Sequence, residues 1–482
     1  MKNKETISSH ISNSPSGVGS FPSATPVIAI FDIGKTNKKL FLFNEQYQIV
    51  LEQQQQFDEI VDEDGFACEN IGALTSWVNQ SLHEILAMKA VDLKAINFST
   101  YGASFVYLNN SGEVIAPLYN YLKPFDEALK KQFYAQYDGE EKFAVRTASP
   151  VLGNLNSGLQ MYRLKYEKPE LFSQIKHALH LPQYMCYLIT GRYFSDITSI
   201  GCHTGLWNFP EYRYHEWVYQ EGISDKLAPI YPSNQLMNIN INDKALLCGT
   251  GLHDSSAALI PYLTNFSEPF ILISTGTWCI SLNPFNSKTL TAQELQQDCL
   301  CYMEYHGKPI KASRLFAGYE HEQQIKRLAA HFNVDKDYYK TVVFNTEIID
   351  VLTKKSRHTI AGETMMQQSL FTQRSLGDFE NYEVAYHQLI FDLVNQQVVS
   401  THLILEKNST KKLFVDGGFS KNPIYMNLLA NAFPTIEVYA SEIAQATAIG
   451  AAMAVHKQWN TKALPSDIIQ LKKYTNSNMI LL

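Results

Sequence analysis

The sequence predicts an α/β protein built from two domains. Strand-like and helix-like segments alternate along the chain, which is the pattern of α/β folds. With 482 residues the chain is too long for one ordinary hydrophobic core, so two domains of roughly 200 residues each are expected. Two apolar strand–turn–strand units with Gly and Thr at the bend lie about 240 residues apart, which indicates either an internal duplication or two ordinary hairpins.

The first of these units begins the folded part of the chain. Residues 27–31 are apolar and predict a buried strand, residues 32–37 predict a tight turn, and residues 38–43 predict a returning strand. The preceding residues 1–25 contain Ser, Pro and Gly without an apolar stretch, so we expect a disordered tail rather than a signal peptide.

Helical patterns follow the first unit. Apolar residues at helical spacing predict a helix over residues 71–88, and a strand is expected at residues 95–99. Residues 157–190 predict two helices, interrupted near Pro169 and Pro182.

The second half begins with the other strand–turn–strand unit. Residues 270–274 and 278–282 predict its strands, and a long apolar-periodic helix is expected over residues 382–406. The strand predicted at residues 412–415 comes next. Because residues 261–269 are the least helical stretch near the middle, we expect a hinge there, between an N-terminal domain (26–262) and a C-terminal domain (263–482).

Composition excludes several classes of function. The chain is 45% hydrophobic and 18% charged with a net charge of −7, which argues against disorder, a nucleic-acid partner and docking on anionic lipid. No run of 18 apolar residues predicts a membrane span. The seven cysteines form no C-x-x-C pair, so reduced, buried thiols in the cytoplasm are expected.

The first turn carries Asp32, Gly34, Lys35 and Thr36. A Walker A loop is excluded because Ala29 stands where its first Gly is needed and a strand follows instead of a helix. An Asp at a strand end beside a Gly turn suits Mg²⁺ through water and phosphate through backbone N–H groups. The alternative is a hairpin in which Asp32 only bonds its own turn.

Two further Gly-containing turns lie in the second half. Thr275-Gly276-Thr277 repeats the first device, because Gly lets backbone approach phosphate and the hydroxyls can donate to it. Asp416-Gly417-Gly418-Phe419 follows a strand, and Asn422 precedes a helix. Asn422 is a natural N-cap, but capping does not explain paired glycines, which favour a planar ligand or phosphate.

Asp254 begins an apolar helix after Gly251-Leu252-His253. An Asp in this place is usually an N-cap. In a phosphoryl-transfer enzyme the same residue could accept the proton of the attacking hydroxyl. No H-E-x-x-H, G-x-S-x-G or strand-linked G-x-G-x-x-G sequence supports another chemistry, and His177 and His180 indicate a helix end rather than a metal site.

Taken in order, these motifs resemble one family, the FGGY carbohydrate kinases. The matching segments span residues 27–456 and are the first hairpin (Asp32 to Lys39), Tyr187-Leu188-x-Thr190-Gly191 with Asp196-x-Thr198, Gly251 to Asp254, Ser274 to Trp278, Asp416 to Asn422, and Ala446 to Ala452. The resemblance implies a two-domain actin-like ATPase fold (the ribonuclease H-like type) with ATP in the cleft between the domains.

The resemblance also implies roles for individual residues. Asp254 would be the catalytic base and Asp32 would organise Mg²⁺. ATP would contact Lys35, Thr36, Thr275, Gly276, Thr277, Gly318, Gly417, Gly418, Phe419 and Asn422. Lys35 stands where the family usually has a small residue, and it could add a positive charge at the phosphates.

The sugar is less well specified. His253-Asp254 and Ser274 to Trp278 look most similar to the rhamnulokinase and fuculokinase branch, which implies a ketose such as L-rhamnulose or L-fuculose. Gly102, Ala103, Ser104, Tyr121 and His253 would contact it. Alternatives are xylulose, ribulose or a polyol such as erythritol, a catalytically silent sugar sensor, and an actin- or chaperone-type ATPase. A cytoplasmic enzyme acting on a small sugar is expected, and a homodimer is one expected assembly.

Overall fold

The structure is a computed structural model that describes residues 24–356, 369–405, 410–443 and 445–475. The chain divides into two compact units. The first consists of Met1–Asn265, Cys301–Pro309 and Ala444–Ile468, and the second of Phe266–Leu300, Ile310–Ile443 and Ile469–Leu482. Neither unit is continuous in sequence, because the chain returns twice to the first. Most of the expected N-terminal tail lies outside the described residues.

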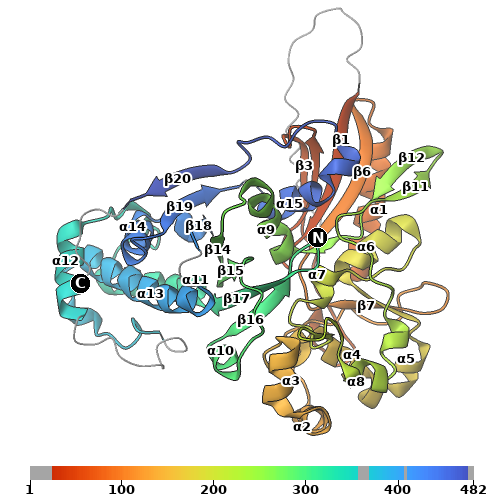
Figure 1. Cartoon of the computed structure of the whole chain (residues 1–482), viewed down its shortest axis with the longest axis horizontal. Coiled ribbons are helices and arrows are strands. Elements are labelled where there is room, and N and C mark those ends of the chain that lie inside the picture. The colour runs from red at the N-terminus through yellow and green to blue at the C-terminus, as the bar shows by residue number, and fades with distance from the viewer. Residues whose placement is uncertain (1–23, 357–368, 406–409, 444, 476–482) are drawn as a thin grey trace, which may run out of the picture. The chain divides into compact units, whose positions relative to one another are not determined.

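A seven-stranded sheet forms the centre of the first unit (Figure 1). Its order is β11-β12-β6-β1-β2-β3, with β13 also paired to β6. The strands are β1 (Thr25–Ile33), β2 (Lys38–Asn44), β3 (Ile49–Gln55), β6 (Val91–Thr100), β11 (Met237–Ile241), β12 (Lys244–Cys248) and β13 (Leu252–His253). The strands expected at residues 27–31, 38–43 and 95–99 are therefore confirmed.

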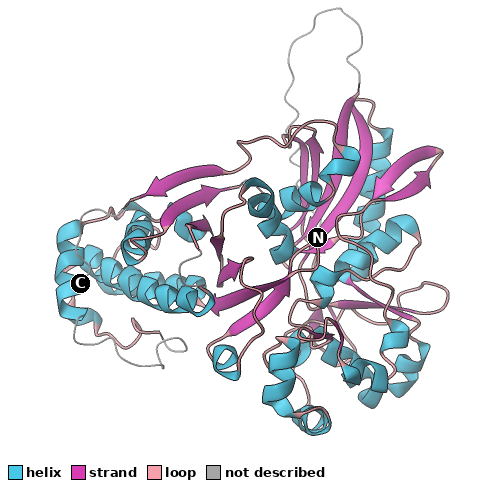
Figure 2. Cartoon of the chain, in the orientation of Figure 1, coloured by secondary structure: helices cyan, strands magenta, loops and turns pink. Residues whose placement is uncertain are grey.

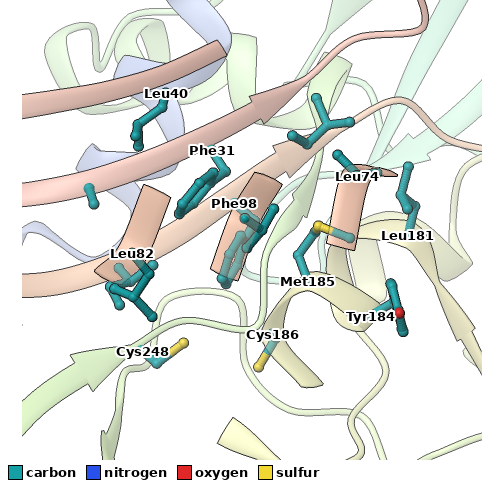
Figure 3. Close-up of a cluster of buried hydrophobic side chains, with 14 of the residues drawn as sticks. Phe31, Leu40, Leu74, Leu82, Phe98, Leu181, Tyr184, Met185, Cys186 and Cys248 are labelled. Atoms are coloured by element: carbon teal, nitrogen blue, oxygen red, sulfur yellow. The ribbon is translucent and has the colours of Figure 1, made fainter. Parts of the chain in front are cut away.

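Apolar side chains on this sheet pack against helices α1 (Ile71–Ala87) and α6 (Leu181–Thr190). Phe31 of β1 stacks on Phe98 of β6 at 5.9 Å, and Figure 3 shows both rings in the core with Leu82 of α1 and Met185 of α6. The expected helix at residues 71–88 is confirmed. It begins where the Asn70 side chain accepts the Ala73 N–H. The core thus fixes the carboxyl ends of β1 and β6, where the candidate site lies.

Helix α9 (Asp254–Asn265) packs against α15 (Ala446–Ala454) within the first unit. Residues 261–265 of the stretch in which a hinge is expected are helical, because Pro261 lies inside α9. The division between the two units falls after Asn265, and the hinge itself stays a prediction. Proline has no N–H, so the carbonyl of Ala257 receives no helical hydrogen bond from it. A Cβ at Gly450 would lie 1.9 Å from that Ala257 oxygen, so α15 approaches the proline-interrupted turn through a glycine.

The region of residues 157–190 differs from its expectation of two helices. It contains α4 (Ser157–Glu167), α5 (Pro169–Gln174), strand β8 (His177–His180) and α6. Both prolines stand in the first turn of a helix, where no N–H partner is lost. His177 and His180 lie in β8, which pairs antiparallel with β7 (Phe105–Leu108). His180 is also the N-cap residue of α6, so it stands at a helix end as expected, whereas His177 is a strand residue.

Shorter elements complete the first unit. They are β4 (Ile60–Val61), β5 (Ala67–Cys68), α2 (Glu127–Gln136), α3 (Gly139–Thr147), η1 (Gly153–Leu155), α7 (Ile197–Ile200), β9 (Trp207–Asn208), β10 (Arg213–Tyr214), α8 (Glu216–Gln220), η2 (Ser224–Lys226) and α16 (His456–Trp459).

A second seven-stranded sheet has the order β16-β17-β15-β14-β18-β19-β20. These strands are labelled in Figure 1, and strands are drawn in magenta in Figure 2. Its strands are β14 (Phe270–Thr275), β15 (Cys279–Asn283), β16 (Cys299–Met303), β17 (Pro309–Leu315), β18 (Lys412–Gly417), β19 (Glu437–Glu442) and β20 (Gln470–Tyr474). The helices of this half are α10 (Ala292–Gln296), α11 (Ala317–Phe332), η3 (Tyr338–Thr341), α12 (Thr346–Ser356), η5 (Leu376–Asp378), α13 (Tyr382–Ile404), η6 (Gly418–Lys421) and α14 (Pro423–Ala432). The expected strands and the long helix are confirmed.

The two sheets repeat one local topology. β1 pairs antiparallel with β2 and parallel with β6, and β14 pairs antiparallel with β15 and parallel with β18. In both, the returning strand continues antiparallel into a further strand. The shared pairing extends beyond the hairpins, so it favours internal duplication over coincidence.

All seven cysteines are buried and form no disulfide, as the sequence predicts. None of the helices in the described residues is long and apolar enough to cross a membrane.

Candidate active site

Asp254 lies at the junction of β13 and α9. His253 pairs with Thr100 of β6, and α9 begins at the next residue. Asp254 Oδ1 accepts hydrogen bonds from Ser255 N (2.6 Å) and Ser255 Oγ (3.3 Å). A helix N-cap accepts instead from N–H groups two or three residues on, so this carboxylate does not act as an ordinary cap. Its side chain keeps 33% of its surface exposed and can meet a ligand.

The surroundings of Asp254 change its acidity. Burial raises its pKa to about 6, although the hydrogen bonds from Ser255 oppose the change. The side chain is therefore reachable from one side but surrounded by protein on the others. At pH 7 a carboxyl of this pKa is mostly ionised, and it accepts a proton more readily than an ordinary aspartate.

Buried groups hold the loop before Asp254. Gly251 N donates to Asn97 Oδ1 (3.1 Å), and Gln183 Nε2 donates to the carbonyls of Thr250 and Gly251. Gly251 has φ +80°, and a Cβ there would lie 2.7 Å from Pro182 Cβ. The glycine of this motif is thus required by backbone conformation and packing.

Asp196 and Thr198 fix the backbone at the same junction. Thr198 Oγ1 accepts the His253 N–H at 3.0 Å and donates to Asp196 Oδ1. Asp196 is fully buried and caps α7 by accepting from Thr198 N and Ser199 N. The Asp196-x-Thr198 signature therefore supports the residue that precedes Asp254.

His253 lies behind Asp254, with only 5% of its surface exposed. Its Nε2 is 3.2 Å from Asp254 Oδ1 and 3.2 Å from Cys202 Sγ, and its ring stacks on Tyr302 at 5.8 Å. A Cβ at Gly102 would lie 2.9 Å from His253 Cδ2. Burial lowers the pKa of His253 to about 4, so the ring is neutral at pH 7. Its observed contact is with the carboxylate, and its contact with a sugar stays a prediction.

Asp32 is the penultimate residue of β1, next to the first turn. Its Oδ2 accepts a hydrogen bond from Thr447 Oγ1 of α15 at 2.7 Å. Burial raises the pKa of Asp32 to about 6, the bond from Thr447 opposes this, and the negative charge of Asp254 raises the pKa further. The two carboxylates therefore repel each other through the protein.

Asp32 and Asp254 suit a magnesium ion that takes its remaining ligands from water and phosphate, rather than a metal held by protein ligands alone. No group of three or more His, Cys, Asp or Glu side chains in the described part of the chain could hold a metal. Mg²⁺ is commonly bound by one or two carboxylates together with waters and phosphate oxygens. Asp32 fits this role, because burial and the nearby charge of Asp254 both disfavour its ionised form and a cation would offset both effects.

The predicted sugar loop is fixed mainly through its backbone. Ala103 has φ +60°, and its carbonyl accepts from Gln160 Nε2 at 2.8 Å. Ser104 is buried and its carbonyl accepts a hydrogen bond from Leu181 N. Because Ala103 and Ser104 are almost fully covered, Gly102 is the residue of the three that remains partly exposed.

Tyr121 lies beside this loop. Its ring meets the Tyr101 ring edge-on at 6.2 Å. The segment is anchored by Lys123, whose Nζ donates to Asp62 Oδ2 and Asp64 Oδ2, both at 2.6 Å. The buried pair of Lys123 with Asp62 anchors the backbone that carries Tyr121.

Lys35 is grouped with the sugar-loop residues. Its Nζ lies 2.9 Å from Glu59 Oε1 and 6.0 Å from the centre of the Tyr101 ring. Thr36, the other residue of this turn predicted to bind ATP, is exposed. The two side chains thus have different surroundings.

The second unit carries the other predicted nucleotide residues. Thr275 Oγ1 donates to the Asp416 carbonyl and accepts the Phe419 N–H at 3.0 Å, so its hydroxyl joins the two turns. Gly276 N donates to Trp278 O at 2.9 Å. The exposed side chain of Thr277 is therefore the hydroxyl of this turn that remains available.

Glycine is required at some of these positions of the second unit by the protein's own packing, and at one of them it is not. A Cβ at Gly318 would lie 1.8 Å from Gly276 O, and one at Gly417, where φ is +90°, would lie 2.0 Å from Thr275 O. Both are required by close backbone packing. A Cβ at Gly418 would meet nothing within 4 Å, so the protein's own packing does not explain Gly418.

Asn422 is largely occupied by protein contacts. Its Oδ1 caps α14 by accepting from Ile424 N and Tyr425 N, as expected, and its Nδ2 donates to Tyr386 OH at 2.9 Å. Phe419 stacks on Tyr425 at 4.6 Å. The ring of His321 meets Phe419 edge-on at 5.3 Å and lies 3.1 Å from Tyr386 OH. These rings form an aromatic group beside Gly418.

Sequence reasoning missed three supporting residues. Thr447 lies in the family-like segment 446–452, and the pattern that could have identified it is a hydroxyl residue in the first turn of an Ala-rich helix. Asn97, buried in β6, joins Gly251 to the Ala451 carbonyl of α15. Tyr302 reaches His253 from the returning segment Cys301–Pro309, and no local pattern marks it.

Comparisons with known proteins agree with this architecture. Residues 27–260 match the N-terminal domain of the FGGY family of carbohydrate kinases, and residues 267–463 match the C-terminal domain of FGGY carbohydrate kinases. A rhamnulokinase from Mannheimia succiniciproducens is 27% identical over 168 residues, which are 34% of this chain and 34% of that protein. The match thus spans about a third of the curated relative.

Solved structures share the fold over most of the chain. A carbohydrate kinase from Novosphingobium aromaticivorans aligns with a TM-score of 0.77 and 22% identity, covering 94% of this chain and 95% of that one. The ligand-bound xylulose kinase from Lactobacillus acidophilus aligns with a TM-score of 0.73 and 16% identity, covering 94% of each chain. The fold is thus the two-domain actin-like ATPase fold of these kinases. The two family matches, in order and over most of the sequence, show that the chain belongs to the FGGY family of carbohydrate kinases.

Proposed function

We propose that this protein transfers the γ-phosphoryl group of ATP to a hydroxyl of a small sugar, with Asp254 as the general base. The observation that carries the proposal is the environment of Asp254. It is a partly exposed carboxylate with a pKa of about 6, it is not used as a helix cap, and its junction is fixed by buried hydrogen bonds. Family membership supplies the reaction class.

In this mechanism the chain mainly positions groups. Asp254 accepts the proton of the sugar hydroxyl as that oxygen attacks phosphorus. His253, neutral and buried, holds the carboxylate through Nε2. Asp32 would hold Mg²⁺, which neutralises phosphate charge when bound. Orientation and charge neutralisation, rather than a covalent intermediate, then account for most of the rate.

The nucleotide contacts are proposed for the second unit and the first turn. Thr277 and the exposed Thr36 would donate hydroxyl hydrogen bonds to phosphate oxygens. The open surface at Gly418 and the ring of Phe419 would border the adenine. Thr275, Gly318 and Gly417 would act indirectly, by holding the two turns of the second unit together.

For the sugar we propose a ketose such as L-rhamnulose or L-fuculose. The partial similarity to a rhamnulokinase supports this branch, whereas the similar fold of a xylulose kinase supports a pentulose as the alternative. A silent sugar sensor would bind sugar without turnover. An actin- or chaperone-type ATPase would hydrolyse ATP without any sugar.

One experiment separates these readings. ADP release by the purified protein with MgATP is measured with L-rhamnulose, L-fuculose, xylulose, ribulose and erythritol, and without sugar. We expect turnover that depends on one ketose, and we expect Asp254→Asn to lower kcat by about 100- to 10,000-fold with an unchanged melting temperature. Asp225→Asn, an exchange at an exposed aspartate of η2, is the control for a surface carboxylate. Sugar-independent ADP release, or full activity of Asp254→Asn, would contradict the proposal.

A further inference from the structure

Lys35 projects from the first turn toward the sugar loop. Lys38 Nζ donates to the Lys35 carbonyl at 2.9 Å and is paired with the buried carboxylate of Glu69. Tyr101 OH donates to the same carboxylate. The backbone of Lys35 and the ring of Tyr101 are thus fixed by one buried cluster, and Lys35 Nζ lies 6.0 Å from the centre of that ring.

The charged end of Lys35 is paired. Its Nζ lies 2.9 Å from Glu59 Oε1, and the two side chains are 27% and 48% exposed. An ion pair that remains open to solvent offers N–H donors and carboxylate acceptors side by side. Adjacent hydroxyls of a polyhydroxy compound match this arrangement, since each hydroxyl both donates and accepts.

The loop after Tyr101 places this pair near the reacting end of the site, since a Cβ at Gly102 would lie 2.9 Å from Cδ2 of His253, the residue before Asp254. Burial raises the pKa of Tyr121. The same group is influenced by the charge of Lys35, which lowers the pKa, and by those of Asp254 and Glu59, which raise it. Lys35, Glu59 and Asp254 are therefore all within electrostatic range of one ring, which itself meets Tyr101 edge-on.

The charges around this pair favour an uncharged sugar over a sugar acid. Glu59 neutralises Lys35, and Asp32 and Asp254 leave the remaining site negative. A sugar acid would place its carboxylate against this charge, whereas an uncharged sugar would not. Aromatic rings beside polar groups suit the apolar C–H faces of such a sugar.

We propose that Lys35 and Glu59 form a specificity pair that reads hydroxyls of an uncharged sugar, and that Lys35 does not bind the nucleotide. This inference rests on the proposed kinase function. The resemblance implied that Lys35 contacts ATP. The inference assigns it to the sugar instead, because its ammonium group lies by Glu59 and the Tyr101 ring, and Tyr101 in turn contacts Tyr121.

The test separates the KM values of the two substrates. Lys35→Met keeps most of the aliphatic stem and removes the charge, and Lys94→Met removes the matched ammonium of the surface pair Lys94–Asp92. With the best sugar from the screen, Lys35→Met should raise the sugar KM about tenfold or more. Its KM for ATP and its Kd for MgADP, measured by calorimetry, should stay within about twofold. Lys94→Met should change neither.

Glu59→Gln provides a second, opposite readout. It leaves the Lys35 charge unpaired, so we expect a raised KM for the neutral sugar and a lowered KM for the matching aldonate. A Lys35→Met variant with a raised KM for ATP and an unchanged sugar KM would overturn the inference and leave the kinase function intact. A wild-type protein that phosphorylates no sugar would instead overturn the proposed function.

Discussion

Asp32 and Asp254 share an unusual acidity. Burial raises the pKa of each to about 6, and the charge of Asp254 adds to the effect at Asp32. Both groups must be ionised if one is to accept a proton and the other to hold Mg²⁺. The pKa values of both carboxylates therefore lie close to neutral pH, so small changes in their surroundings alter how far each is ionised.

The first prediction concerns pH. Protonation below the raised pKa removes the base, so kcat/KM should be constant above pH 7 and should fall below about pH 6. On the acid side, a plot of log kcat/KM against pH should have a slope between one and two, since Asp32 titrates in the same range as Asp254. Initial rates from pH 5 to 8 at saturating MgATP test this. A profile that stays flat down to pH 5 would contradict the assigned roles.

The second prediction concerns Thr447. Its hydroxyl donates to Asp32 and lowers the carboxyl's pKa. Thr447→Val removes that bond, so the pKa of Asp32 should rise and the acid limb of the profile should move to higher pH. Thr461→Val removes a similar bond, to the exposed carboxylate of Glu45, and should leave the profile unchanged. Equal profiles for both variants would show that Thr447 does not tune Asp32.

At the scale of elements, the third prediction concerns the packing of α15 on α9. Gly450→Ala places a methyl 1.9 Å from the Ala257 carbonyl, so the helices must separate, at a cost of about 1–3 kcal/mol in the free energy of unfolding. Gly72→Ala in α1, where the nearest atom is 3.6 Å away, should be neutral or stabilising by about 0.5 kcal/mol. Urea unfolding of both variants tests this. An unchanged midpoint for Gly450→Ala would rule out the close packing.

The fourth prediction concerns the paired glycines after β18. Gly417→Ala should destabilise the fold, because its φ is +90° and its methyl would meet Thr275 O. Gly418→Ala should leave the melting temperature unchanged and raise the KM for ATP, since only a ligand would meet its methyl. Thermal unfolding and ATP titrations separate the two effects. A normal KM in Gly418→Ala would place the adenine elsewhere.

The predictability of elements depended on how local their signals are. The strands β1, β2, β14 and β15 were predictable because each is an apolar run next to a Gly turn. The strand β8 was missed because His177 to His180 lie between two prolines in an apolar region that reads as helix. Its partner β7 is more than 60 residues earlier in the chain, so no local pattern specifies the pairing.

At the scale of the whole molecule, the fifth prediction concerns the composition of the first unit. It includes Cys301–Pro309 and Ala444–Ile468, and α15 supplies partners to both Asp32 and Asn97. A fragment of residues 24–265 lacks these segments, so we expect it to lose cooperative unfolding and sugar binding. Circular dichroism melts and calorimetry against the full chain test this. A fragment with a sharp transition and normal sugar affinity would show that the returning segments are dispensable.

Long-range organisation was the part least accessible from sequence. Asp254, Asp32 and the Gly-rich turns could be located because their motifs are short and ordered. The partners of His253 and Asp32 could not, because Tyr302 and Thr447 come from segments far along the chain whose return depends on tertiary packing. The place of Lys35 was likewise set by Glu59 and Tyr101, which lie on other elements.

The return of residues 444–468 to the first unit has a consequence for synthesis. The segment that completes the unit holding Asp254 leaves the ribosome roughly 200 residues after α9, which at about 5–20 residues per second is a delay on the order of 10–40 s. During that time Gly450 is absent and the Ala257 turn of α9 is uncovered. The nascent chain therefore carries an unfinished catalytic half until residues 444–468 have emerged, and a chaperone that holds this half would act before the active site exists.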